Sequence, residues 1–241
     1  MSVKFPGTPS LLFLAIVLVL IPLAARRTAH RLRKESPGKP VSRLTYWRSA
    51  VVFQLLLLLL AWWTGASFDY PMFAVAAVTV KDVLFAVAAL AACLGLRLAS
   101  RWTRSEEELK ALSVYERAPR TRAEVAWFCA AVVAASIAEE ATNRGVGMSI
   151  LWYSLGIPWI AALLMSIAFA LAHWNQGWKS GLTIFAFAGI FHALVYTTET
   201  LVFAMLVHAA YDFIAGAEIR KKARKYDLER PATECNPSSL P

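Results

Sequence analysis

The sequence predicts an all-α protein, a polytopic transmembrane bundle of about seven helices. Hydrophobic residues make up 58% of the 241-residue chain, whereas soluble domains contain about 45–50%. These residues gather in long blocks, and a helix needs roughly 17–25 apolar residues to cross a bilayer. The blocks do not show the period-two alternation that is typical of a membrane β-barrel.

Seven apolar blocks define the expected spans. They cover residues 10–25, 50–66, 83–96, 123–138, 158–173, 182–196 and 201–215. We read the first block as a retained span, because Arg26 and Arg27 follow it directly, the opposite charge order to a secretory signal. An eighth, re-entrant element around residues 147–156 remains compatible with the pattern.

The net charge of +9 is concentrated between the spans. Most of the 25 Lys and Arg residues lie in segments 26–48, 97–122 and 220–230. Basic loops stay on the cytoplasmic side of a membrane, and seven spans with an outer N-terminus place all three segments on that side. The charge therefore indicates topology and lipid contact rather than nucleic-acid binding.

The chain divides into four parts. Residues 1–100 form three plain spans without an ionisable residue at their apolar centres, and we expect no chemistry there. Residues 101–122 form a mixed-charge cytoplasmic amphipathic linker. Residues 123–217 form a four-helix core that holds every ionisable group expected at membrane depth. Residues 218–241 form a cytoplasmic tail, first basic and then Pro-rich and disordered.

Polar groups at membrane depth are costly and therefore suggest function. In SIAEEATNRGVG, Glu140 and Arg144 are four residues apart with the acid first, the favourable order for an ion pair on a helix. Glu139 lies about 100° further round the helix, and its neighbour at the same spacing, Asn143, offers only a hydrogen bond. An unpaired carboxylate there suits a general base or acid. The alternative is a helix end whose charges reach the interface.

Two later motifs add histidines. FALAHWNQG places Phe169 and His173 one turn apart, although a histidine at a helix end is more often structural. In LVFAMLVHAAYDF, His208 and Asp212 share a helix face, so the acid either orients the imidazole or forms a buried pair that stabilises packing. His192 ranks lower, because no acid follows four residues later and it equally suits a core histidine bonded to a hydroxyl.

This set of residues suits two chemistries. A glutamate could activate water while histidine and aspartate stabilise an oxyanion. Alternatively, two histidines and a carboxylate could hold Zn²⁺, with ligands drawn from Glu139, His173, His208 and Asp212. Both lead to hydrolysis of an amide in or beside the membrane. The H-E-x-x-H motif of soluble metalloproteases does not occur.

The ordered motifs E-E-x-x-x-R, F-x-x-x-H and H-x-x-x-N/D resemble the CPBP (Abi) family of intramembrane proteases. That family includes the type II CAAX prenyl endopeptidases and proteins tied to bacteriocin processing and immunity. The resemblance covers about residues 124–216. The matching residues are Glu139, Glu140, Arg144, Phe169, His173, His208 and Asp212.

The resemblance implies roles for these residues. Glu139 would activate the attacking water, with Glu140 and Arg144 in support. His173, His208 and Asp212 would position the water or stabilise the oxyanion. No cofactor is required on this glutamate mechanism, although zinc remains an alternative.

This chain departs from the family pattern at two positions. Asn143 replaces a common aromatic residue, and we place it with Phe169 and His192 in the substrate-binding region. Asp212 replaces the commoner Asn and cannot donate a hydrogen bond unless it is protonated. Its oxyanion role is therefore open, and the metal alternative gains slightly.

We therefore expect an intramembrane endopeptidase acting on a membrane-anchored or prenylated peptide. Its partners would be the bilayer and that substrate. We expect it in the bacterial inner membrane with a cytoplasmic C-terminus, although the charge pattern suits the endoplasmic reticulum equally. The alternatives are a non-proteolytic scaffold or immunity protein on the same fold, and a proton-coupled transporter. One geometric question is open: Glu139 meets His173 only if residues 123–127 lie in the interface or residues 145–156 extend the fourth helix.

Overall fold

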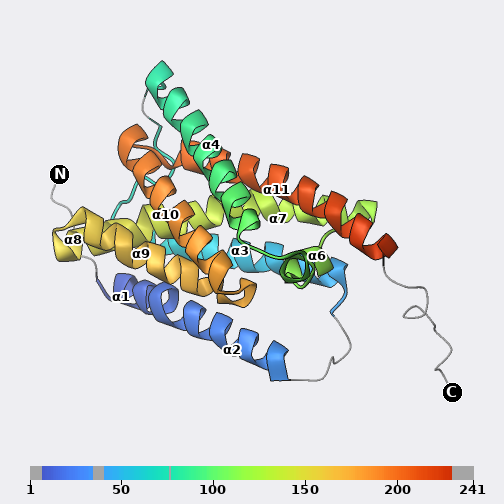
Figure 1. Ribbon diagram of the computed structural model, residues 1–241. Coiled ribbons are helices and arrows are strands. Elements are labelled where there is room, and N and C mark those ends of the chain that lie inside the picture. The colour runs from blue at the N-terminus through green and yellow to red at the C-terminus, as the bar shows by residue number, and fades with distance from the viewer. Residues whose placement is uncertain (1–6, 35–40, 76, 230–241) are drawn as a thin grey trace.

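The computed structural model describes residues 7–34, 41–75 and 77–229 (Figure 1). Helices dominate this part of the chain, and none of the described residues forms a strand. The elements in order are α1 (Thr8–Ala15), η1 (Ile16–Leu20), α2 (Ile21–Lys34), α3 (Arg43–Ala66), α4 (Val80–Trp102), α5 (Glu106–Lys110), α6 (Ser113–Glu116), α7 (Arg122–Glu140), η2 (Ala141–Gly147), α8 (Met148–Leu155), α9 (Pro158–Ala172), η3 (Trp174–Gln176), α10 (Trp178–Thr198) and α11 (Leu201–Glu229).

The predicted fold class, an all-α membrane bundle, is confirmed. Within the described ranges, six helices are long and apolar enough to cross a membrane, and the apolar helix α9 is shorter. Large apolar side chains, among them Leu56 and Trp62, are exposed on the outside of these helices, as lipid contact requires. The protein is therefore an integral, multi-pass membrane protein of about seven spans.

Local sequence signals fix where several helices begin. Thr121 precedes α7 and accepts a hydrogen bond from the Glu124 amide, while Glu124 bonds back to the Thr121 amide. The same reciprocal pairing, a capping box, joins Thr79 and Asp82 before α4. The mixed-charge linker forms two short helices, α5 and α6. At the other end, α11 continues to Glu229, and the predicted disordered segment from residue 231 lies outside the described residues.

The helices pack around α7, which is central in the bundle. It lies along α3 on one side and α11 on another. In Figure 1, α1 and α2 run along one edge of the bundle beside α9, whereas α4 crosses α11 on the opposite edge. Each half of the bundle has its own apolar core. Val146, Met165 and Met205 belong to one, and Phe187 and Phe191 to the other.

The fourth long helix is interrupted by a π-helical segment but not ended by it. α7, η2 and α8 together form one span of 34 residues, Arg122–Leu155. Residues 145–155 therefore extend the helix instead of forming an eighth element, but this extension does not bring His173 into contact with Glu139. All seven residues of η2 are buried, and π-helical insertions are frequent at functional sites.

Gly147 lies at the end of η2, where other atoms approach closely. A Cβ at this position would lie 2.5 Å from Met165 Cε and 2.7 Å from the main-chain oxygen of Thr142. A main-chain oxygen cannot swing away as the end of a side chain can. A larger residue would therefore displace the π-helical segment itself.

We predict that Gly147→Ala lowers the free energy of unfolding by about 1–3 kcal/mol, the usual cost of overpacking. Gly189→Ala on α10 is the matched control, because no atom lies within 4 Å of its Cβ position. Alanine should leave stability unchanged there or raise it by up to about 1 kcal/mol. Denaturant unfolding of the purified protein in detergent measures both, and equal effects would contradict the packing argument.

Candidate active site

The carboxylate of Glu140 is the centre of the buried polar cluster. Its side chain is fully buried, and its Oε1 accepts hydrogen bonds from Arg144 Nη1 at 3.2 Å and from His208 Nδ1 at 2.8 Å. The ion pair with Arg144 is the one that the helical spacing predicted. The bond to His208 joins the fourth long helix to α11, and the sequence did not predict it.

Arg144 is enclosed by aromatic rings. Its guanidinium carbon lies 4.7 Å from the ring centre of Phe169 and 5.3 Å from that of Phe191. Among the described residues, its Nε and Nη2 find no hydrogen-bond partner. Attraction between the cation and the ring faces offsets part of that loss, so Phe169 and Phe191 help to hold a positive charge away from water.

Glu139 occupies a different environment from its neighbour. Its side chain retains 13% exposure, and its Oε1 accepts a hydrogen bond from Gln54 Nε2 on α3 at 2.7 Å. Its Oε2 lies 3.9 Å from His208 Nε2, which is too long for a direct hydrogen bond. One oxygen is thus fixed by an amide, and the other faces the histidine.

His208 lies among three carboxylates. Nδ1 contacts Glu140, while Nε2 faces both Glu139 and the Oδ2 of Asp212, at 3.6 Å from the latter. An ionised carboxylate can only accept, so the short contact with Glu140 assigns a proton to Nδ1. The predicted proximity of His208 and Asp212 is present, but Glu140 is the closer partner of the ring.

His173 is set apart from these carboxylates. It follows the last residue of α9, its Nδ1 lies 2.8 Å from the main-chain oxygen of Phe169, and its ring packs 4.7 Å from the Phe169 ring. Neither ring nitrogen forms an ion pair with a carboxylate of the described residues. Its ring contacts Phe169, which in turn contacts the Arg144 guanidinium group.

Two other predicted residues make contacts that differ from expectation. Asn143 donates its amide to the main-chain oxygen of Glu139 at 2.8 Å, so it supports the π-helical turn rather than the carboxylate. His192 was weighed as a core histidine bonded to a hydroxyl. Its buried Nε2 has no hydrogen-bond partner in the described part of the chain.

The zinc alternative gains no support from this arrangement. Within the described ranges, the His, Cys, Asp and Glu side chains form no group of three or more that could hold a metal ion. We therefore derive no step through a metal, and metal dependence stays an untested alternative.

Gln54 is the residue of the cluster that sequence reasoning missed. We expected residues 1–100 to contribute no chemistry because their spans hold no ionisable group. A signal was nevertheless present, since Gln54 is a polar residue inside the apolar run AVVFQLLLLLL. A polar side chain at membrane depth needs a partner even when it carries no charge.

We predict that Arg144→Leu lowers the free energy of unfolding by about 3–5 kcal/mol, because it leaves the Glu140 charge buried without its cation. Glu139→Gln should change stability less, since Glu139 is partly exposed and its contact with His208 is 3.9 Å long, whereas Arg144 lies 3.2 Å from the fully buried Glu140. Thermal unfolding in detergent compares the two variants. Equal losses would contradict the division between a buried, structural carboxylate and a partly exposed one.

Comparison with known proteins supports the family that the motifs resemble. The family model described as type II CAAX prenyl endopeptidase Rce1-like matches residues 121–214. Searches of curated proteins and of solved structures gave no match. The matched segment contains both glutamates, Arg144 and His208, whereas Gln54 lies outside it. Residues 121–214 are thus similar to the Rce1-like family, which is consistent with the CPBP (Abi) resemblance of the motifs.

Proposed function

We propose that this protein is an intramembrane endopeptidase that hydrolyses a peptide bond with water activated by Glu139. The observation that carries the proposal is the contrast between the two adjacent glutamates. Glu140 is buried and bonded to two cationic or polar donors, whereas Glu139 is partly exposed and directs one oxygen towards His208. A general base needs an oxygen that is free to accept a proton.

The reacting water would lie between Glu139 Oε2 and His208 Nε2. Their separation of 3.9 Å suits two polar groups that share a water better than it suits a direct bond. Glu139 would take a proton from this water as its oxygen attacks the carbonyl carbon. The proton would then pass to the leaving amine, so that the carboxylate is regenerated.

His208 would stabilise the negative charge that develops on the carbonyl oxygen. With a proton on each ring nitrogen, it donates from Nδ1 to Glu140 and from Nε2 to the oxyanion. Asp212, 3.6 Å from Nε2, would orient the ring, because an ionised carboxylate cannot itself donate. His173 would act from the edge of the site, through its contact with Phe169.

The substrate class follows from where the site lies. Its two glutamates, Arg144 and His208 come from apolar, membrane-length helices, so a substrate must present its peptide bond at the bilayer. The family description names prenyl endopeptidases, and we propose a membrane-anchored or prenylated peptide as substrate. On the basis of the basic segments, we place the C-terminus in the cytoplasm. That argument applies to a bacterial inner membrane and to the endoplasmic reticulum alike, and of the two we propose the bacterial inner membrane.

Glu139→Gln tests the proposal directly. Peptide termini are compared in membranes from cells that carry the wild type, Glu139→Gln, or the control Glu199→Gln, matched for protein level. Glu199 lies in the turn between α10 and α11, outside the site. A terminus present with the wild type and the control but missing with Glu139→Gln would establish proteolysis and identify the substrate.

The opposite result has a clear meaning. If no terminus differs while a cellular phenotype still depends on the motifs, the protein is not a protease. If the phenotype occurs without transport of any solute, the scaffold alternative would explain it. If it follows a solute flux that depends on the membrane potential, the transporter alternative would explain it.

Gln54→Leu should lower kcat by roughly 10- to 100-fold, the cost of one hydrogen bond to a charged group. KM should change little, because Gln54 contacts the base rather than the substrate. In the Glu139→Gln background the same substitution should have no further effect, as coupled residues are not additive. Cleavage of the identified substrate measures all three variants, and an unchanged kcat in Gln54→Leu would remove Gln54 from the mechanism.

A further inference from the structure

A cavity lined by arginine and hydroxyl-bearing residues lies away from the candidate active site. It has a volume of about 150 Å³ and is bounded by α4, α10, α11 and the two short linker helices. Figure 1 shows α6 beside α11, near the end of α4. Arg97 and Arg101 line the cavity from α4, and Arg104 lines it from the turn that follows α4. Arg97 and Arg101 are four residues apart, which places both on one face of the helix.

The described acidic groups do not balance these three guanidinium groups. Arg97 Nη2 lies 3.1 Å from Glu218 Oε2, and Arg101 Nη1 lies 3.7 Å from the same oxygen. Arg104 donates to the hydroxyl of Ser180 at 3.0 Å and forms no ion pair with a carboxylate of the described residues, although Glu108, which is paired with Lys179, acts on it at longer range. One carboxylate therefore serves two arginines, and the cavity keeps an excess of positive charge.

Unused donors point to an anionic ligand. The Nε atoms of Arg97 and Arg101 are buried and find no hydrogen-bond partner within the described ranges. A buried donor without a partner is costly, so a bound acceptor would relieve both at once. Hydroxyl groups of Ser100, Ser113 and Thr183 line the same cavity and can bond further oxygens of that ligand.

We propose that this cavity binds the phosphate group of an anionic phospholipid. The planar guanidinium group of arginine can donate two parallel hydrogen bonds to two oxygens of a phosphate group. Basic pockets between spanning helices, at the depth of the headgroups, are suited to such lipids. The site makes no use of Glu139 or its partners, so the proposal stands independently of the proposed catalysis.

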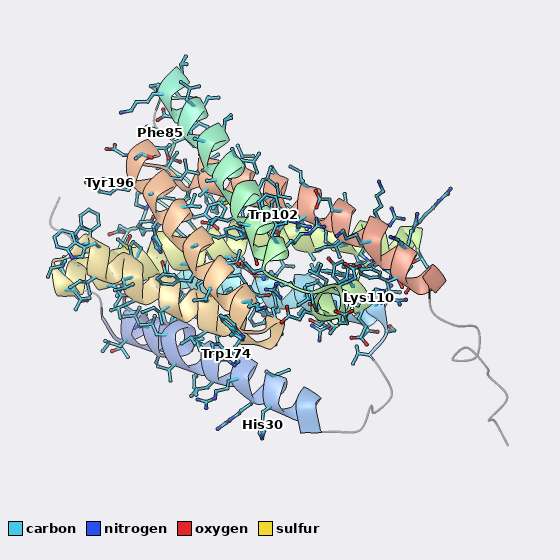
Figure 2. All side chains as sticks on the ribbon, viewed as in Figure 1. His30, Phe85, Trp102, Lys110, Trp174 and Tyr196 are labelled. Carbon is cyan, nitrogen blue, oxygen red and sulfur yellow. The ribbon has the colours of Figure 1, made fainter. Side chains whose placement is uncertain are left out.

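Two tryptophans place the cavity at the membrane interface. Trp102 follows Arg101 directly, at the end of α4, and is 86% exposed (Figure 2). Trp178 begins α10 two residues before Ser180 and is 62% exposed. Exposed tryptophans are enriched where the hydrocarbon core meets the headgroups. A lipid in the adjacent leaflet therefore has its phosphate at the same depth as the three arginines.

Aromatic rings separate the cavity from the catalytic cluster. Phe187 and Tyr211 both line it, and their rings pack with centres 4.8 Å apart. Tyr211 lies within one turn of His208 on α11, while Phe187 lies one turn from Phe191 on α10. The bound lipid would thus support the same two helices that hold the candidate active site without entering it.

Thermal unfolding of the full chain, purified in detergent and freed of lipid, tests the proposal. Phosphatidylglycerol in mixed micelles should raise Tm by roughly 5–10 °C near saturation, whereas phosphatidylcholine should not. The double variant Arg97→Gln/Arg101→Gln should lose this shift. Arg26→Gln/Arg27→Gln, which removes the same charge from α2, should keep it.

The single variant Arg104→Gln keeps the proposal testable if the double variant fails to fold. Its side chain makes a single described hydrogen bond, to Ser180, so the bundle should remain intact. The loss of one charge-assisted bond should weaken phosphatidylglycerol binding roughly tenfold. A shift that is unchanged in both cavity variants, or equal for the two lipids, would overturn the proposal.

Two further ligands distinguish the source of the anion. Inorganic phosphate giving the same arginine-dependent shift would support a phosphate site but assign it to a soluble anion instead of a lipid. A short peptide that acts through its free C-terminal carboxylate, with no effect of phosphatidylglycerol, would overturn lipid binding and identify a peptide-binding site. Each result is read from the same Tm measurement.

Discussion

The geometry of the site depends on one buried carboxylate. Glu140 has no exposed surface and receives Arg144 from its own helix and His208 from α11 on the same oxygen. A charge in that position is tolerated only with such partners, so the sequence on either side must bring them there. The π-helical segment, the aromatic rings around Arg144 and the approach of α11 to α7 all serve that requirement.

The sequence predicts well the contacts that form between residues of one helix. Glu140 with Arg144, and His208 with Asp212, are pairs one turn apart, and helical periodicity alone places them together. The contact between Glu140 and His208 joins residues 68 positions apart. This contact depends on how α11 packs against α7. The hydrophobic periodicity of a single helix contains no information about that packing.

Other differences have equally physical reasons. Asn143 was expected to partner the Glu139 side chain, but an amide four residues later on a helix reaches the main-chain oxygen more readily. Gln54 was overlooked because only ionisable groups were sought in the first three spans. His173 was grouped with the other histidines by motif, whereas its place at the end of α9 keeps it beside Phe169.

The two glutamates differ because adjacent residues on a helix point about 100° apart. That rotation turns Glu140 towards α11 and Glu139 towards α3, where Gln54 meets it. Glu139 therefore lies at the seam between the segment matched by the family model and the helices that precede it. The matched segment supplies the charges, but an earlier helix fixes one oxygen of the proposed base. Helix α3 is thus part of the site's geometry, and a description confined to residues 121–214 would omit the group that orients Glu139.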